Sequence, residues 1–177
     1  NSLLILAFAG LAWRSALERS DGPSILALSR QNLTQQPHPA EHDSLVARGG
    51  YVVWDAPAAR ALLLASGSEV DLAVQAAQAM AREDLPVRVV SMPCMEVFRE
   101  QPEAYREQVL PRQLRARLSI EAGAGMSWHE WVGEGGRMLS IERFGESAPI
   151  ADVYRALGFT VEHITQLVRD LLAAPEG

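Results

Sequence analysis

The chain has 177 residues, of which 48% are apolar and 21% charged, and its formal net charge is −6. These proportions are typical of a soluble globular domain and argue against a disordered chain, a collagen and a disulfide scaffold. The net negative charge also argues against a nucleic-acid-binding protein, which needs a local basic surface.

The residue counts exclude further kinds of chemistry. All 16 basic residues are arginines, so a lysine Schiff base and a Walker A phosphate loop are excluded. The single cysteine, Cys94, cannot form an intramolecular disulfide, which fits a reducing, cytoplasmic location. Because no basic residue adjoins it, we expect Cys94 to be a small, partly buried side chain and not a nucleophile.

Residues 1–33 form the first region. The apolar run Leu3–Trp13 would make about 16 Å of helix, too short to cross a bilayer, so we expect no membrane segment. A helix is predicted around Leu11–Glu18, and after a Gly-Pro turn the run Ser24–Leu28 predicts a buried strand. Residues 34–48 have no apolar periodicity and two prolines, and they are interpreted as a linker.

Residues 49–177 form the third region, in which strand and helix patterns alternate. Expected strands and helices, in chain order, are strands 51–54 and 61–65, helix 69–83, strand 87–90, helix 102–110, strands 117–121 and 138–141, and a last helix capped by Thr160. This alternation predicts a three-layer α/β/α fold with a mainly parallel sheet.

Several groups of polar residues are candidates for a catalytic or metal-binding site. The glutamates of the stretch Glu96–Glu107 alternate with arginines and are interpreted as one solvated helical face. His129-Glu130 lacks the second histidine of a zinc motif, and His38, His42 and His163 are scattered, so no metal site is expected.

Two anion-binding hypotheses remain. Gly67-Ser68 precedes a helix and could present backbone N–H groups to an anion, although capping of the helix by Ser68 explains the residues as well. Arg30 follows the predicted strand 24–28, and its planar guanidinium suits a phosphate or carboxylate; an ion pair at the strand edge is the alternative.

A series of short motifs resembles the transketolase family. They cover about Leu11–Leu172, and Asn1–Gly10 departs from the family's pattern. In chain order they are ALSRQNL (27–33), ARGGYV (47–52), ASGSEV (65–70), VVSMP (89–93), VLP (109–111), EAG (121–123), FGESAP (144–149) and GFTV (158–161).

The resemblance implies the C-terminal part of a thiamine diphosphate enzyme that transfers a two-carbon ketol unit between sugar phosphates of the pentose phosphate pathway. It implies a cytoplasmic homodimer that uses Mg²⁺, and a C-terminal domain built on a mixed five-stranded sheet. Residues 1–33 would be a remnant of the pyrimidine-binding domain, 34–48 the linker and 49–177 the C-terminal domain. By direct match, Arg30 would contact the sugar phosphate in the full-length enzyme.

The catalytic residues of that family have no counterpart in these motifs. The GDG…N signature is absent, and the catalytic glutamate and histidines are expected upstream of Asn1. We therefore expect no catalytic, cofactor-binding or metal-binding residue here, and a structural, dimer-supporting role. Alternatives are the C-terminal domain of a deoxyxylulose-phosphate synthase or pyruvate dehydrogenase β subunit, a stand-alone anion-binding module and a dimerisation module.

Overall fold

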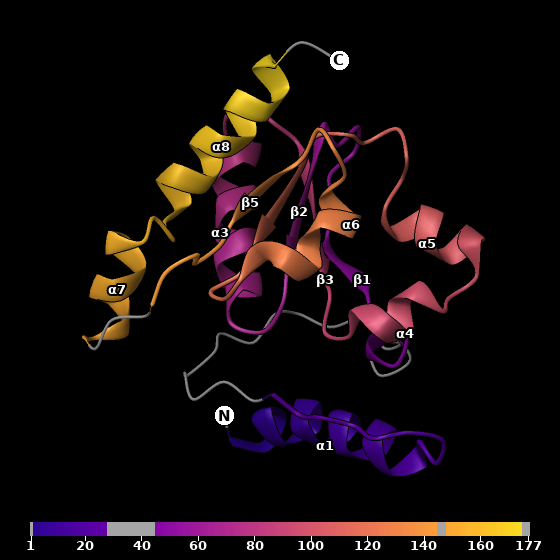
Figure 1. Cartoon of the computed structure of the whole chain (residues 1–177). Helices are drawn as coiled ribbons and strands as arrows, with labels where there is room; N and C mark the ends of the chain where they lie inside the picture. Colours follow the sequence, from indigo (N-terminus) through magenta and orange to yellow (C-terminus); the bar gives the residue numbers. More distant parts are fainter. Residues whose placement is uncertain (1, 28–44, 145–147, 175–177) are drawn as a thin grey trace.

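The structure, a computed structural model, describes residues 2–27, 45–144 and 148–174. Its centre is a five-stranded sheet in the order β1-β3-β2-β4-β5 (Figure 1). The strands are β1 (Tyr51–Trp54), β2 (Ala61–Ala65), β3 (Val87–Ser91), β4 (Arg117–Ile120) and β5 (Arg137–Leu139).

Only the edge strand β1 runs against its neighbour, because β1 pairs with β3 antiparallel while the pairs β2–β3, β2–β4 and β4–β5 are parallel. In β2 every residue is buried, as expected for a central strand covered on both faces. The mainly parallel, mixed five-stranded sheet predicted from the sequence is confirmed.

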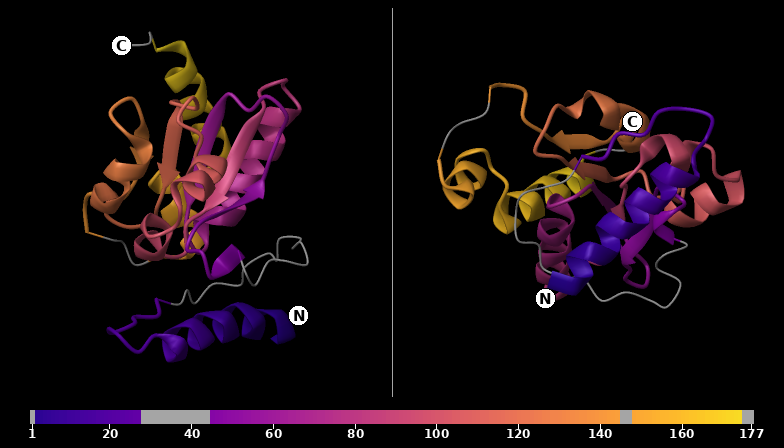
Figure 2. Two further views of the ribbon diagram at one scale, coloured as in Figure 1. Left: turned by 90° about the vertical axis from the view of Figure 1, so that its right-hand side faces the viewer. Right: turned by 90° about the horizontal axis from the view of Figure 1, so that it is seen from below.

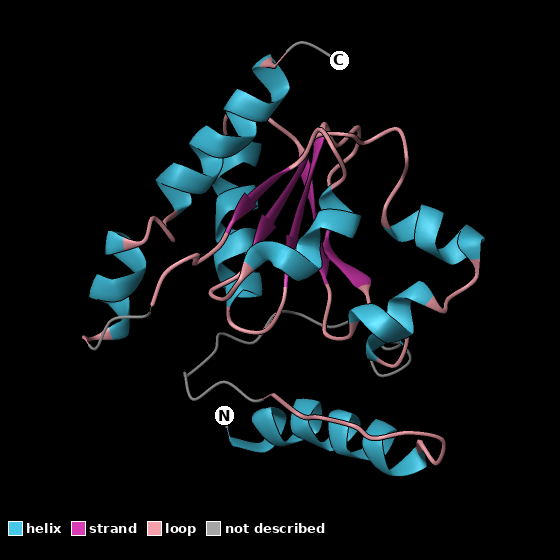
Figure 3. Cartoon of the chain, in the orientation of Figure 1, coloured by secondary structure: helices cyan, strands magenta, loops and turns pink. Residues whose placement is uncertain are grey.

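Helices cover both faces of the sheet (Figure 3). One face carries α3 (Glu69–Ala81) and α8 (Val161–Ala173), which bury Met80 and Ile164 against Leu63 and Leu118. The other carries α4 (Met95–Arg99), α5 (Glu103–Val109), the 3₁₀ helix η1 (Gly125–Trp128) and α6 (His129–Val132). Their core centres on aromatic side chains, with the Phe98 ring 5.4 Å from Trp131 and 6.1 Å from Tyr105. Alternate strand residues thus divide between two hydrophobic cores.

Two helices differ from these. Helix α7 (Ile150–Ala156) has no fully buried residue, although its Tyr154 packs against the core beneath α3 and α8. Helix α1 (Ser2–Glu18) lies below the layered body in Figure 1 and in the left view of Figure 2. Of the described helices, none is long and apolar enough to cross a membrane.

The strand predicted over Ser24–Leu28 is wrong for the part that the structure describes. Residues 24–27 have no regular structure, and the Ile25 side chain is 93% exposed. A strand needs a neighbour to accept and donate its backbone hydrogen bonds, and the sheet of this domain offers 24–27 none.

The helical face expected over Glu96–Glu107 is also wrong in one respect, because α4 and α5 are separate helices with residues 100–102 between them. Pro102 begins α5 as its N-cap and cannot continue α4. The charged side chains of this stretch pair with other segments: Arg99 pairs with Glu130 of α6, and Glu103 and Glu107 pair with Arg112.

Candidate functional site

The carboxyl ends of β2 and β4 are the natural place to look for a site in this sheet. The chain leaves β2 into α3 on one face and leaves β4 into η1 on the other, although the two strands are hydrogen-bonded neighbours. In α/β proteins, ligands commonly bind where the connections from neighbouring strands diverge in this way. Ser66 and Glu121 are the first residues after the two strands.

Glu121, at this edge of the sheet, is held by donors from both faces. Ser66 Oγ donates to Glu121 Oε2 at 2.9 Å, and the Trp128 side chain also hydrogen-bonds the carboxylate. Burial raises the pKa of Glu121, the Ser66 and Trp128 hydrogen bonds oppose that rise, and the nearby charge of Glu69 adds to it. The carboxylate therefore serves as the acceptor that joins the ends of β2 and β4.

The Glu69 carboxylate lies beside Ser68 at the start of α3. Its side chain is only 4% exposed, and its Oε1 accepts hydrogen bonds from Ser68 Oγ at 2.8 Å and from the Tyr154 hydroxyl. The expected capping of α3 by the Ser68 side chain is wrong, because this hydroxyl donates to Glu69 and makes no capping bond. A phosphate at Gly67-Ser68 would lie beside a buried carboxylate, so the geometry disfavours the anion-binding hypothesis for this helix end.

A third carboxylate, Glu142, follows β5. It accepts hydrogen bonds from the Gly125 backbone N–H at 2.9 Å and from Ser140 Oγ at 2.8 Å. These two donors lower the pKa of Glu142. This carboxylate thus ties the beginning of η1 to the segment after β5.

Taken together, the three carboxylates accept hydrogen bonds from the domain's own donors and contribute negative charge at the edge. No three His, Cys, Asp or Glu side chains gather as a metal ion requires anywhere in the described part of the chain. The three carboxylates at the carboxyl edge of the sheet therefore join strands, helices and loops of the domain through hydrogen bonds.

The sequence-predicted site residue Arg30 lies outside the described residues, as do His38 and His42. Of the other candidates, Cys94 is partly buried as expected, with its Sγ 3.6 Å from a Glu96 carboxylate oxygen. His163 Nδ1 lies 2.8 Å from the Gly158 carbonyl oxygen at the start of α8.

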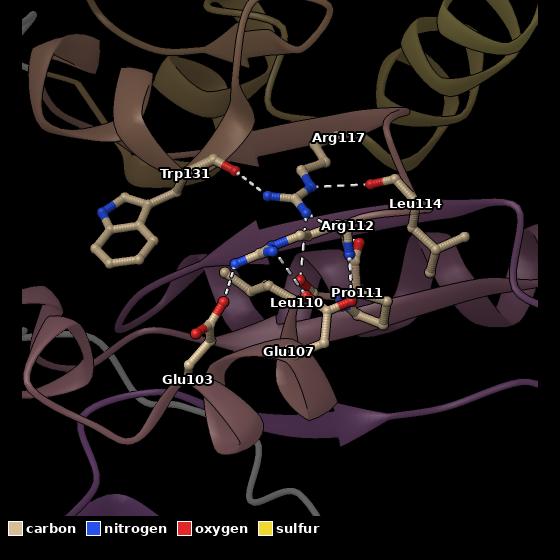
Figure 4. Close-up of polar contacts among 8 residues, drawn as sticks. All are labelled: Glu103, Glu107, Leu110, Pro111, Arg112, Leu114, Arg117 and Trp131. Atoms are coloured by element: carbon tan, nitrogen blue, oxygen red, sulfur yellow. Dashed lines mark hydrogen bonds and ion pairs between the residues drawn. The ribbon is translucent and has the colours of Figure 1, made fainter.

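Arg117 makes several hydrogen bonds that the sequence did not indicate (Figure 4). Its guanidinium, at the start of β4, donates to four backbone carbonyls: Leu114 at 2.9 Å, Trp131 at 2.8 Å, Pro111 at 3.0 Å and Leu110 at 3.3 Å. Desolvation lowers the pKa of Arg117, and the charge of Glu107 opposes this.

The carbonyl partners show what Arg117 does. They come from the loop after α5 and from α6, so one cation fixes two segments on the same face of the sheet. The signal was present in the sequence, since an arginine at the start of an apolar strand needs partners for all its donors. Its partners are backbone atoms, however, and no side-chain pattern points to them.

An open cavity of about 550 Å³ lies at the opposite, amino edge of the sheet. The loop after β1 and the segment after α5 line it, together with Arg88. The Arg88 guanidinium is already bidentate on Asp55, at 2.9 and 2.8 Å, and donates to the Gln108 carbonyl at 2.8 Å. Because these bonds occupy its guanidinium, Arg88 joins β3 to Asp55 and to the end of α5 and is not available to bind an anion.

Comparisons with known proteins relate this architecture to one family. Residues 49–160 match the family model described as "Transketolase-like TK C-terminal domain". Transketolase 1 of Vibrio vulnificus (strain YJ016) is 48% identical over 166 residues, which are 93% of this chain and 25% of that protein. The chain therefore spans about a quarter of the length of the curated relatives it matches.

Solved structures agree. The transketolase from Leishmania mexicana superposes with a TM-score of 0.84 and 40% identity, covering 94% of this chain and 24% of that one. A transketolase mutant from Pichia stipitis, solved in complex with fructose 6-phosphate, gives a TM-score of 0.85 at 31% identity, covering 92% and 23%. The similarity thus extends over nearly the whole chain.

Proposed function

This chain belongs to the transketolase family, and from that premise we propose that it is the C-terminal portion of a transketolase. The complete enzyme would transfer a two-carbon ketol unit between sugar phosphates with thiamine diphosphate and a divalent metal, as a homodimer in the cytoplasm. The match to the family's C-terminal domain over residues 49–160 carries this proposal, and 48% identity to a Vibrio transketolase supports it.

We divide the chain accordingly into a remnant of the preceding pyrimidine-binding domain (1–33), a linker (34–48) and the C-terminal domain (49–177). Support comes from the exposure of the apolar segment before the linker: Trp13, Leu17 and Ile25 are 56%, 79% and 93% exposed. Apolar side chains so exposed suit a segment that packs against another part of a larger protein.

The C-terminal domain has a structural role in this proposal. The polar groups at its carboxyl edge hydrogen-bond one another, and Arg117 and Arg88 bond to backbone and carboxylate groups of the domain. The described residues do not fit thiamine diphosphate or its metal, because they supply no cluster of metal ligands and the start of α3 carries a buried carboxylate. Catalysis would therefore depend on residues of the other domains.

Arg30 is the residue to which we assign direct contact with substrate in the complete enzyme. It matches the arginine of the SRQNL motif, and a permanently charged, forked donor is suited to a phosphate dianion. This assignment rests on the motif.

A chimera tests the proposed function. Residues from Leu11 onward replace the corresponding C-terminal segment of the Vibrio vulnificus transketolase, and ketol transfer between sugar phosphates is measured with thiamine diphosphate and Mg²⁺. We expect an active chimera, and no turnover by the 177-residue chain alone under the same conditions. An inactive but folded and dimeric chimera, or an active isolated chain, would contradict the proposal.

A further inference from the structure

The chain enters the C-terminal domain through two glycines that pack closely against other segments. Gly49 and Gly50 are both buried, although the residues just before them, Ala47 and Arg48, are exposed. Gly49 has a φ of +79° and ends a short helical turn, with its N–H donating to the Val46 carbonyl at 3.0 Å. A left-handed conformation at this position favours glycine.

The space around both glycines is filled by the β3–α4 region. A Cβ atom on Gly49 would lie 2.3 Å from the Cys94 carbonyl oxygen and 2.6 Å from the Phe98 backbone nitrogen. A Cβ on Gly50 would lie 2.7 Å from the Phe98 ring and 2.9 Å from the Met92 sulfur. The close backbone approach permits a hydrogen bond from the Cys94 N–H to the Gly49 carbonyl at 3.1 Å.

Helix α5 holds the same point from another side. The Tyr105 hydroxyl, on a side chain only 9% exposed, donates to the Gly50 carbonyl at 2.8 Å. The Arg48 guanidinium lies over the Tyr105 ring, 4.5 Å from its centroid. Burial raises the pKa of Tyr105, so the phenol keeps the proton that it donates.

We propose that Gly49, Gly50 and Tyr105 form a clasp that makes the junction between linker and C-terminal domain a rigid mount instead of a hinge. The clasp joins the incoming chain to the β3–α4 loop, to α4 and to α5, so the direction in which residues upstream of Arg48 leave the domain is fixed. Gly49, Gly50 and Tyr105 are positioning residues in this inference. Its biological meaning rests on the proposed function, since a rigid mount would set the orientation of the C-terminal domain within a transketolase.

Backbone ¹⁵N relaxation of the 177-residue chain tests the clasp. In the unmodified protein we expect order parameters of about 0.85 for residues 49–52, the value of rigid backbone. In Gly49→Ala they should fall below about 0.6, as in flexible segments. Exchange of the Cys94 amide hydrogen, which bonds to Gly49, should accelerate by at least about tenfold while exchange in β2 stays unchanged.

Gly67→Ala is the matched control. Gly67 also has a positive φ, +54°, but no atom lies within 4 Å of the added Cβ. This variant carries backbone strain without the clash, and we expect residues 49–52 to keep their order parameters. If Gly49→Ala does not fold, Tyr105→Phe provides the test, because it removes only the hydroxyl that bonds Gly50.

Two results would overturn the clasp: order parameters below about 0.6 at residues 49–52 of the unmodified protein, or order at the junction and slow Cys94 exchange persisting in Tyr105→Phe. Both measurements use the isolated chain and need no enzymatic activity. A folded, dimeric but inactive chimera would therefore refute the proposed function without affecting the clasp, and a mobile junction would refute the clasp alone.

Discussion

Ser66 and Glu121 are 55 positions apart in the chain, yet their side chains meet in a 2.9 Å hydrogen bond at the ends of β2 and β4. The bond lies where the connections from the two strands diverge to opposite faces of the sheet. It also places a partly buried carboxylate near a second one, Glu69, and this has a measurable consequence for stability.

Glu121→Gln should change the pH dependence of stability. The pKa of Glu121 is higher in the folded state than its unfolded value of 4.5. The favourable contribution of this group to the free energy of unfolding is therefore complete below pH 4.5, and it is lost as pH rises through the folded pKa. Glutamine does not titrate, so we expect the stability of Glu121→Gln relative to the unmodified protein to increase as pH rises from 4.5 through the folded pKa of Glu121. Urea denaturation at a series of pH values measures this difference.

Glu142→Gln is the control of opposite sign. The pKa of Glu142 is lowered by Gly125 and Ser140, so its contribution is present above the unfolded value and is lost as pH falls. The difference between Glu142→Gln and the unmodified protein should therefore shrink toward low pH. The same trend in both variants would contradict the assignment of the two environments.

Arg117→Ala should destabilise the domain by about 2–4 kcal/mol, because it removes a partly buried cation and leaves carbonyls of the α5–β4 loop and α6 without their donor. Arg117→Lys should recover only part of this loss, since one ammonium cannot reach the same four carbonyls. Chemical denaturation measures both changes.

Arg112 is a matched control for this prediction (Figure 4). Its side chain is 75% exposed and pairs with Glu103 and Glu107. Arg112→Ala should cost no more than about 1 kcal/mol, the usual value of exposed ion pairs. Equal losses of stability in Arg117→Ala and Arg112→Ala would show that the hydrogen bonds from Arg117 to the four carbonyls stabilise the domain no more than an exposed ion pair does.

Thr160→Ala should weaken the start of α8 by about 1 kcal/mol. The Thr160 Oγ1 accepts a hydrogen bond from the His163 backbone N–H at 3.2 Å, and alanine cannot replace this acceptor. Thr160→Ser keeps the hydroxyl and should retain most of the stability in thermal or urea unfolding. A serine variant as unstable as the alanine variant would locate the effect in the methyl group's packing.

Arg30→Ala, made in the active chimera, should raise KM for phosphorylated sugars by about 10- to 150-fold, the value of one charge-assisted contact. KM for unphosphorylated sugars should change far less. Arg14→Ala, on an exposed side chain of α1 that pairs with Glu18, is the control and should leave both constants unchanged. Similar increases for both sugar types would remove Arg30 from the phosphate site.

The sequence by itself determined the family, the alternation of strands and helices in residues 49–177 and the capping of α8 by Thr160. These features depend on local periodicity, turn residues and motifs, all of which act over a few neighbouring positions. The expected strands 51–54 and 61–65 coincide with β1 and β2, because their apolar runs are short and bounded by Gly, Pro and polar residues.

Only the tertiary structure decided which polar groups meet. Ser66 with Glu121, Tyr154 with Glu69, and Arg117 with four backbone carbonyls are contacts between segments that the sheet brings together. It also decided that residues 24–27 form no strand, because strand formation requires a hydrogen-bonding neighbour that apolar character alone does not provide. Long-range pairing depends on the fold as a whole, and a local pattern contains no information about the distant partner.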